Sequence, residues 1–95
     1  MTDFLDTLFA LIEDRKAHPV ADSYTNRLLA QGLDSITQKV GEEAIEVIIA
    51  AHSQSDRRLV EELADLVYHS LVLLSYKGLT LEDVRAELER RHRPR

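Results

Sequence analysis

The sequence has no cysteine and no tryptophan, and it contains only three glycines and two prolines. Without cysteine the chain forms no disulfides and offers no thiolate ligands for zinc. The absence of cysteine also fits a reducing compartment. The scarcity of glycine and proline, together with the lack of sustained strand-like alternation, indicates a helical chain.

Long apolar runs and an excess of positive charge are also missing. No stretch approaches the roughly 20 apolar residues that a membrane-spanning helix needs, and Asp3 and Asp6 stand where a secretory signal would carry basic residues. The net charge of −5 opposes general nucleic-acid binding through phosphate neutralisation. We therefore expect a cytoplasmic protein with neither nucleic-acid nor membrane partners.

Helical periodicity runs from end to end and predicts one all-α domain, residues 1–95. We expect a compact bundle of four main helices, at about 3–16, 35–53, 56–76 and after Thr80. So short a chain buries only about 60–65% of its unfolded surface and has no disulfides to compensate. Oligomerisation to at least a homodimer should therefore complete the bundle.

Local signals mark several helix ends. A short helix or turn is expected at 26–30, ended by Gly32. Ser35 and Gln38 have the capping-box spacing, which places a helix start at Ser35. Lys77 followed by Gly78 is typical of a helix end.

Two acidic stretches lie on consecutive predicted helices. On a helical wheel, the first helix groups a lysine and three carboxylates in one sector: Lys39, Glu42, Glu43 and Glu46. The next helix aligns three polar residues at spacings of three and four: Glu62, Asp65 and His69. Apolar residues lie beside both stripes, whereas a solvated helix face stands opposite a single apolar stripe. The pattern indicates a partly buried acidic site between two helices.

Acids held together in such a groove repel one another, and a divalent cation removes that repulsion. Oxygen ligands favour Mg²⁺, with Mn²⁺ as an alternative, and Mg²⁺ takes phosphate oxygens as further ligands. The pattern therefore points to hydrolysis of a phosphorylated substrate. Either stripe alone is more often a solvated face, so a non-catalytic helical dimerisation module is the alternative.

The segment from Lys39 to Glu46, followed by Glu62 to His69, closely resembles the phosphoribosyl-ATP pyrophosphohydrolase family. This is the histidine-biosynthesis branch of the all-α nucleotide pyrophosphohydrolases, and the resemblance extends over about 23–91. It implies Mg²⁺-dependent hydrolysis of 1-(5-phosphoribosyl)-ATP to phosphoribosyl-AMP and pyrophosphate by a tight homo-oligomer. The family's metal motif falls on four carboxylates: Glu43, Glu46, Glu62 and Asp65.

Other roles have two interpretations each. Glu42 and Glu46 are candidate catalytic acids that orient or deprotonate water, although Glu42 could equally be a solvated acid. Lys39 could bind substrate phosphate or only pair with Glu43. His69 could contact substrate or be a hydrogen-bonded core histidine. A related pyrophosphohydrolase acting on ordinary nucleoside triphosphates is the nearest alternative, because the acidic motif recognises phosphates rather than bases.

Overall fold

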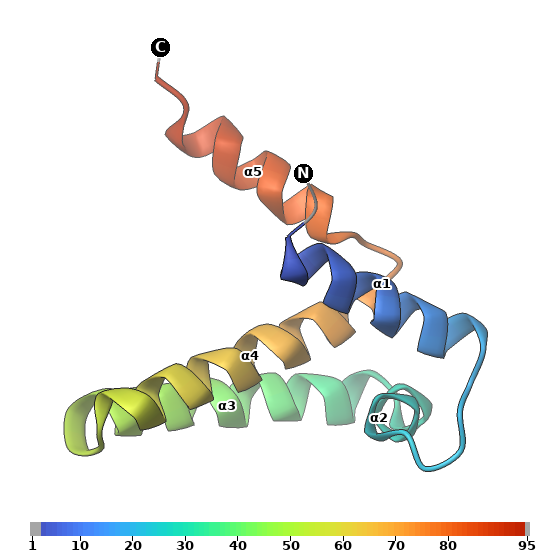
Figure 1. Ribbon diagram of the computed structural model, residues 1–95, viewed down its shortest axis with the longest axis horizontal. Helices are drawn as coiled ribbons and strands as arrows, with labels where there is room; N and C mark the ends of the chain where they lie inside the picture. The colour runs from blue at the N-terminus through green and yellow to red at the C-terminus, as the bar shows by residue number, and fades with distance from the viewer. Residues whose placement is uncertain (1–2, 95) are drawn as a thin grey trace.

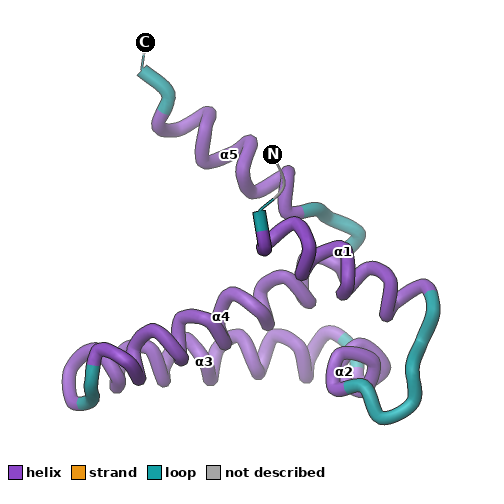
Figure 2. Tube along the Cα trace, viewed as in Figure 1, coloured by secondary structure: helices purple, strands orange, loops and turns teal. Residues whose placement is uncertain are grey.

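The computed structural model describes residues 3–94, which form five α-helices and no strand within that range (Figures 1 and 2). The helices are α1 Phe4–Ala17, α2 Tyr24–Gln31, α3 Leu33–Ser53, α4 Asp56–Tyr76 and α5 Leu81–His92. The all-α prediction is confirmed, and the short helix expected near 26–30 is α2. None of these helices is long and apolar enough to cross a membrane. The cytoplasmic location stays a prediction.

Side-chain caps begin four of the five described helices. The side chains of Asp3, Ser23, Ser55 and Thr80 accept hydrogen bonds from backbone amides at the starts of α1, α2, α4 and α5. These caps satisfy amides that have no partner inside the helix.

The capping box predicted at Ser35 is wrong, because α3 begins at Leu33 and has no side-chain cap. Gly32 explains the difference. With φ of +93° it ends α2 and begins α3 at the same residue, a conformation that glycine adopts readily. Ser35 therefore falls inside the first turn of α3.

The antiparallel pair α3 and α4 is the centre of the fold, and the two helices lie side by side in Figure 1. Helix α1 packs on α4, and α2 packs near the start of α3. A hydrophobic core joins these four helices at one end of the pair: Phe9, Ile12, Leu28, Ile36, Leu71 and Val72.

The other half of the α3–α4 pair, toward the connection at Gln54, has little apolar cover. Six large aliphatic residues remain exposed there: Ile45, Ile48, Ile49, Val60, Leu63 and Val67. The radius of gyration is 14.7 Å, whereas a compact chain of this length should have about 12 Å. The exposed aliphatic residues show that one chain by itself leaves the bundle open along this half, and the extension of α5 also adds to the radius of gyration.

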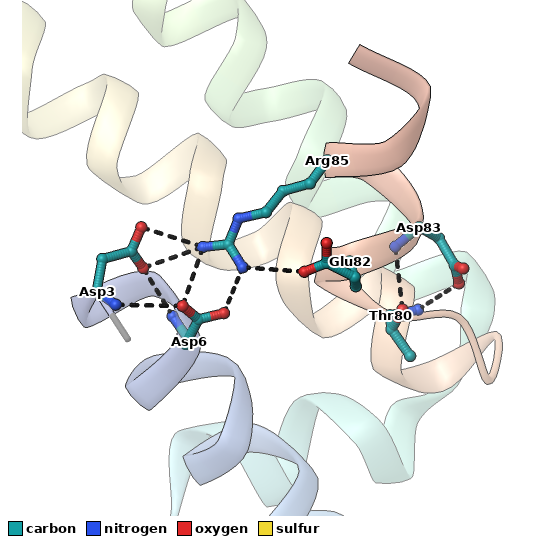
Figure 3. A network of polar contacts seen from close by, with 6 residues as sticks. All are labelled: Asp3, Asp6, Thr80, Glu82, Asp83 and Arg85. Atoms are coloured by element: carbon teal, nitrogen blue, oxygen red, sulfur yellow. Dashed lines mark hydrogen bonds and ion pairs between the residues drawn. The ribbon is translucent and has the colours of Figure 1, made fainter. Parts of the chain in front are cut away.

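Helix α5 extends away from the α3–α4 pair and buries none of its residues (Figure 1). Arg85 connects it to the first turn of α1 (Figure 3). Its guanidinium donates to Asp3 at 3.1 Å and also to Asp6 and Glu82. The hydrogen bond from Arg85 holds the pKa of Asp6 below its ordinary value.

Arg85→Met should free α5 from α1. We expect the pKa of Asp6 to rise toward its ordinary value of 3.8 and amide exchange in α5 to accelerate. Because the folded-state pKa is lowered, the stabilisation is present above the unfolded-state pKa and is lost as pH falls through the folded one. NMR titration of the carboxyl groups measures this.

The matched control is Arg90→Met, because Arg90 pairs with Glu87 within α5 itself. An unchanged Asp6 titration in Arg85→Met would show that this ion-pair network does not hold the helices together.

Candidate functional site

Three predicted metal ligands converge between α3 and α4. One carboxylate oxygen from each of Glu43, Glu62 and Asp65 lies within 4.8 Å of the others. Glu43 comes from α3, while Glu62 and Asp65 share one face of α4 at a spacing of three. Glu43 is 9% exposed and Glu62 is 6% exposed, whereas Asp65 is exposed. The cluster is therefore open to solvent on the side of Asp65.

Two cations offset the charge of this cluster within the chain. Lys39 Nζ lies 3.4 Å from Glu43 Oε1 and 3.7 Å from Glu42 Oε1. Arg58 donates to both Glu61 and Glu62. Each helix thus supplies a counter-ion for its own buried carboxylate.

Lys39 forms the pair with Glu43 that its spacing of four residues predicts. Burial acts to lower the pKa of Lys39, but Tyr24 and the carboxylates of Glu43 and Glu42 outweigh it and raise that pKa. A substrate contact by Lys39 stays a prediction. Arg58 was missed by sequence reasoning, although its spacing of four to Glu62 could have revealed it.

The converging atoms are all carboxylate oxygens, with no imidazole nitrogen or thiolate among them. Such a set fits a hard divalent cation better than zinc. Two of the three carboxylates are nearly buried, which strengthens their attraction for a cation compared with a solvated face.

Glu42 and Glu46 lie on the exposed side of α3. Glu46 is one helical turn beyond Glu43 and is not among the three residues whose oxygens converge. Glu42 accepts a hydrogen bond from Gln38 Nε2 at 3.3 Å. The predicted catalytic roles of both, and metal binding by Glu46, stay predictions.

His69 is buried at 6% exposure and uses both ring nitrogens within the chain. Its Nδ1 lies 2.7 Å from the carbonyl oxygen of Asp65. Since a carbonyl only accepts, Nδ1 donates. In the neutral ring Nε2 then accepts from the Tyr24 hydroxyl, 2.8 Å away. These contacts agree with the interpretation of His69 as a hydrogen-bonded core histidine. A substrate contact by His69 stays a prediction.

Further contacts attach α2 to α4. The Thr25 hydroxyl is hydrogen-bonded to the Tyr68 hydroxyl, and the rings of Tyr24 and Tyr68 lie 6.2 Å apart. Burial raises the pKa of Tyr24, whereas the charge of Lys39 opposes that rise. The bonds from Tyr24 to His69 and from His69 to the backbone of Asp65 connect Tyr24 to the acidic cluster. No local pattern could have shown this, because Tyr24 and His69 are 45 positions apart.

The comparisons with known proteins agree with one another. Residues 5–92 match the family model described as phosphoribosyl-ATP pyrophosphohydrolase. The chain is 48% identical over 90 residues to the phosphoribosyl-ATP pyrophosphatase of Clostridium acetobutylicum, covering 95% of this chain and 82% of that protein. It is 46% identical over 92 residues to the phosphoribosyl-ATP pyrophosphatase of Bacillus mycoides, covering 97% and 86% respectively.

A longer relative is the histidine biosynthesis bifunctional protein HisIE of Oceanobacillus iheyensis. The chain is 51% identical to it over 83 residues, which are 87% of this chain and 39% of that protein.

His69→Phe should keep an aromatic ring at this position and remove both hydrogen bonds. We expect the free energy of unfolding to fall by about 1–3 kcal/mol, because a buried hydrogen-bonded group is lost. Urea denaturation measures the change. The control, His52→Phe on an exposed part of α3, should change stability by less than about 0.5 kcal/mol. Equal effects in the two variants would contradict a structural role for the His69 hydrogen bonds.

Proposed function

The chain belongs to the phosphoribosyl-ATP pyrophosphohydrolase family, and we propose that its acidic cluster is the site that hydrolyses 1-(5-phosphoribosyl)-ATP. The products are phosphoribosyl-AMP and pyrophosphate, in the pathway of histidine biosynthesis. The observation that carries this assignment is the convergence of Glu43, Glu62 and Asp65. A triphosphate brings several negative charges, so a carboxylate site can accept it only together with a cation.

Glu43, Glu62 and Asp65 would hold Mg²⁺, or Mn²⁺ in its place, and Glu46 is the fourth predicted ligand. The support is a set of oxygen atoms without nitrogen or sulfur, which these ions prefer. When bound, the ion neutralises phosphate charge and lowers the pKa of water.

The remaining acids of α3 would handle the proton. Glu46 forms no ion pair or side-chain hydrogen bond with residues 3–94, so the carboxylate oxygen that does not hold the cation can accept a proton from the attacking water. Glu42, which contacts Gln38 and Lys39, would orient that water. The water adds to one of the two phosphorus atoms joined by the α–β bridging oxygen. The bond from that phosphorus to the bridging oxygen breaks, the bridging oxygen stays on the other phosphate, and phosphoribosyl-AMP and pyrophosphate separate.

Incubation with 1-(5-phosphoribosyl)-ATP and Mg²⁺ should release pyrophosphate, and chelation should stop the release. Glu62→Gln and Asp65→Asn should lower kcat/KM by about 100-fold or more, because each loses a carboxylate that supports the cation. Without Mg²⁺ the thermal stability of Asp65→Asn should stay level or rise, since like-charge repulsion is relieved. Glu62→Gln also loses the partner of Arg58, so its thermal stability should fall. Mg²⁺ should raise the melting temperature of the wild-type protein, and this increase should be absent in both variants.

Glu89→Gln is the matched control, because Glu89 lies exposed on α5 and pairs only with Arg93 among the described residues. A parallel series with ordinary nucleoside triphosphates separates this substrate from those of related pyrophosphohydrolases. Full activity and an unchanged Mg²⁺ response in Glu62→Gln would remove the basis of the assignment.

A second copy of the chain would cover the open half of the α3–α4 pair. Exposed aliphatic residues lie on both helices of that half, including Ile45, Ile48 and Leu63. Two such pairs related by a two-fold axis would pack as a four-helix arrangement, which buries these residues without further chain. The acidic cluster of each chain, at the middle of its helix pair, would then lie at the edge of the shared core.

Ile48→Arg should convert the assembly to a monomer. Ile48 is 59% exposed in the single chain, and an unpaired arginine cannot enter an apolar interface without a large desolvation cost. Light scattering after size-exclusion chromatography measures the mass. Val20→Arg, in the connection between α1 and α2, is the control and should keep the wild-type mass. A wild-type protein that is already monomeric, or an Ile48→Arg protein of unchanged mass, would refute this interface.

A further inference from the structure

The substrate assigned to this site carries one phosphate outside its triphosphate, and the inference below rests on that assigned function. This fourth phosphate is a monoester on the ribose that is attached to the purine. Carboxylates such as Glu42 and Glu46 repel it, so its binding requires a cation beside the acidic cluster. We propose that Arg27, held over the ring of Tyr24, binds this 5-phosphate and selects phosphoribosyl-ATP over simple nucleotides.

The charges around the site single out Arg27. Lys39 and Arg58 both lie within ion-pair distance of carboxylates of the cluster. Arg27 is exposed and forms no ion pair with any residue of 3–94. Its guanidinium carbon lies 5.9 Å from the centre of the Tyr24 ring, an arrangement that leaves its donors free for an anion. A planar guanidinium matches two phosphate oxygens at once.

Tyr24 gives Arg27 a fixed position although the tyrosine itself is 42% exposed. The Tyr24 hydroxyl is held by His69 Nε2 at 2.8 Å, and the two rings meet edge to face at 5.8 Å. His69 is in turn held by the carbonyl oxygen of Asp65 at 2.7 Å. A continuous series of contacts therefore runs from Asp65, in the acidic cluster, to Arg27.

The same contacts make Arg27 a neighbour of the site. The Arg27 guanidinium carbon lies 5.9 Å from the centre of the Tyr24 ring, and Tyr24 is connected through His69 to the backbone of Asp65 in the acidic cluster. A substrate whose triphosphate meets the acids through a cation can reach Arg27 with its other charged end. Tyr24 is a positioning residue in this arrangement, and Arg27 is the residue that contacts phosphate.

The test compares phosphoribosyl-ATP with N1-ribosyl-ATP, which lacks only the 5-phosphate. Arg27→Gln should raise KM for phosphoribosyl-ATP by about 10- to 100-fold, the loss of one charge-assisted phosphate contact, with little change in kcat. KM for N1-ribosyl-ATP should stay unchanged. Arg27→Lys should retain part of the selectivity, because it keeps the charge and loses the fork of donors. The control is Lys77→Gln, an exposed cation at the end of α4.

Tyr24 variants test the positioning. Tyr24→Phe keeps the ring beneath Arg27 but loses the bond to His69, so it should preserve part of the selectivity, whereas Tyr24→Leu should lose it even though Arg27 remains. Equal losses for the two substrates in Arg27→Gln, or no loss for either, would overturn the inference while the wild-type activity stands. A folded wild-type protein that releases no pyrophosphate from phosphoribosyl-ATP would overturn the assigned function and this inference together.

Discussion

The structure depends on the pairing of two helices around carboxylates that are nearly buried. Glu43 and Glu62 come from opposite sides of the α3–α4 interface, where two uncompensated negative charges would push the helices apart. Lys39 and Arg58 prevent this, because each lies four residues before the carboxylate that it neutralises. The pair can therefore close without any external cation, and the acids are assembled before a substrate arrives.

The two ends of this helix pair serve different purposes. Helices α1 and α2 cover one end and build the core around Ile36 and Val72. The other end carries exposed isoleucine and leucine residues that the chain cannot cover alone. The acidic cluster lies between these regions, so the hydrophobic core borders it on one side and the exposed aliphatic residues border it on the other.

Local patterns predicted the parts of the structure that local physics decides. Spacings of three and four placed Glu62 with Asp65 on one face, and the wheel directed Glu43 toward them. The stop at Gly78 depends on the geometry of its own helix end, so it too could be predicted. The pattern also identified apolar positions such as Ile48, but it could not tell which surface covers them.

Contacts between distant segments could not be predicted in this way. The bond between Tyr24 and His69 joins positions 45 apart, and that between Arg85 and Asp6 joins positions 79 apart. Both arise from how whole helices pack. At Ser35 a local pattern predicted a helix start that the structure does not have. The backbone conformation of Gly32 begins α3 earlier, at Leu33. The identity of the substrate was predicted from family resemblance, because acidic residues interact with phosphates through a cation and do not distinguish one base from another.

The junction at Gly32 has an evolutionary consequence. A β-carbon there would meet nothing closer than the Tyr76 hydroxyl at 3.7 Å, so the backbone angle, and not lack of space, requires glycine. Insertion or deletion of one residue at this junction would change the direction in which α2 meets α3. The acids of α3 and α4 would remain in place, while Tyr24 and Arg27 would face elsewhere. Under the role proposed for Arg27, a change in length at this junction would alter substrate selectivity and leave the acidic cluster in place.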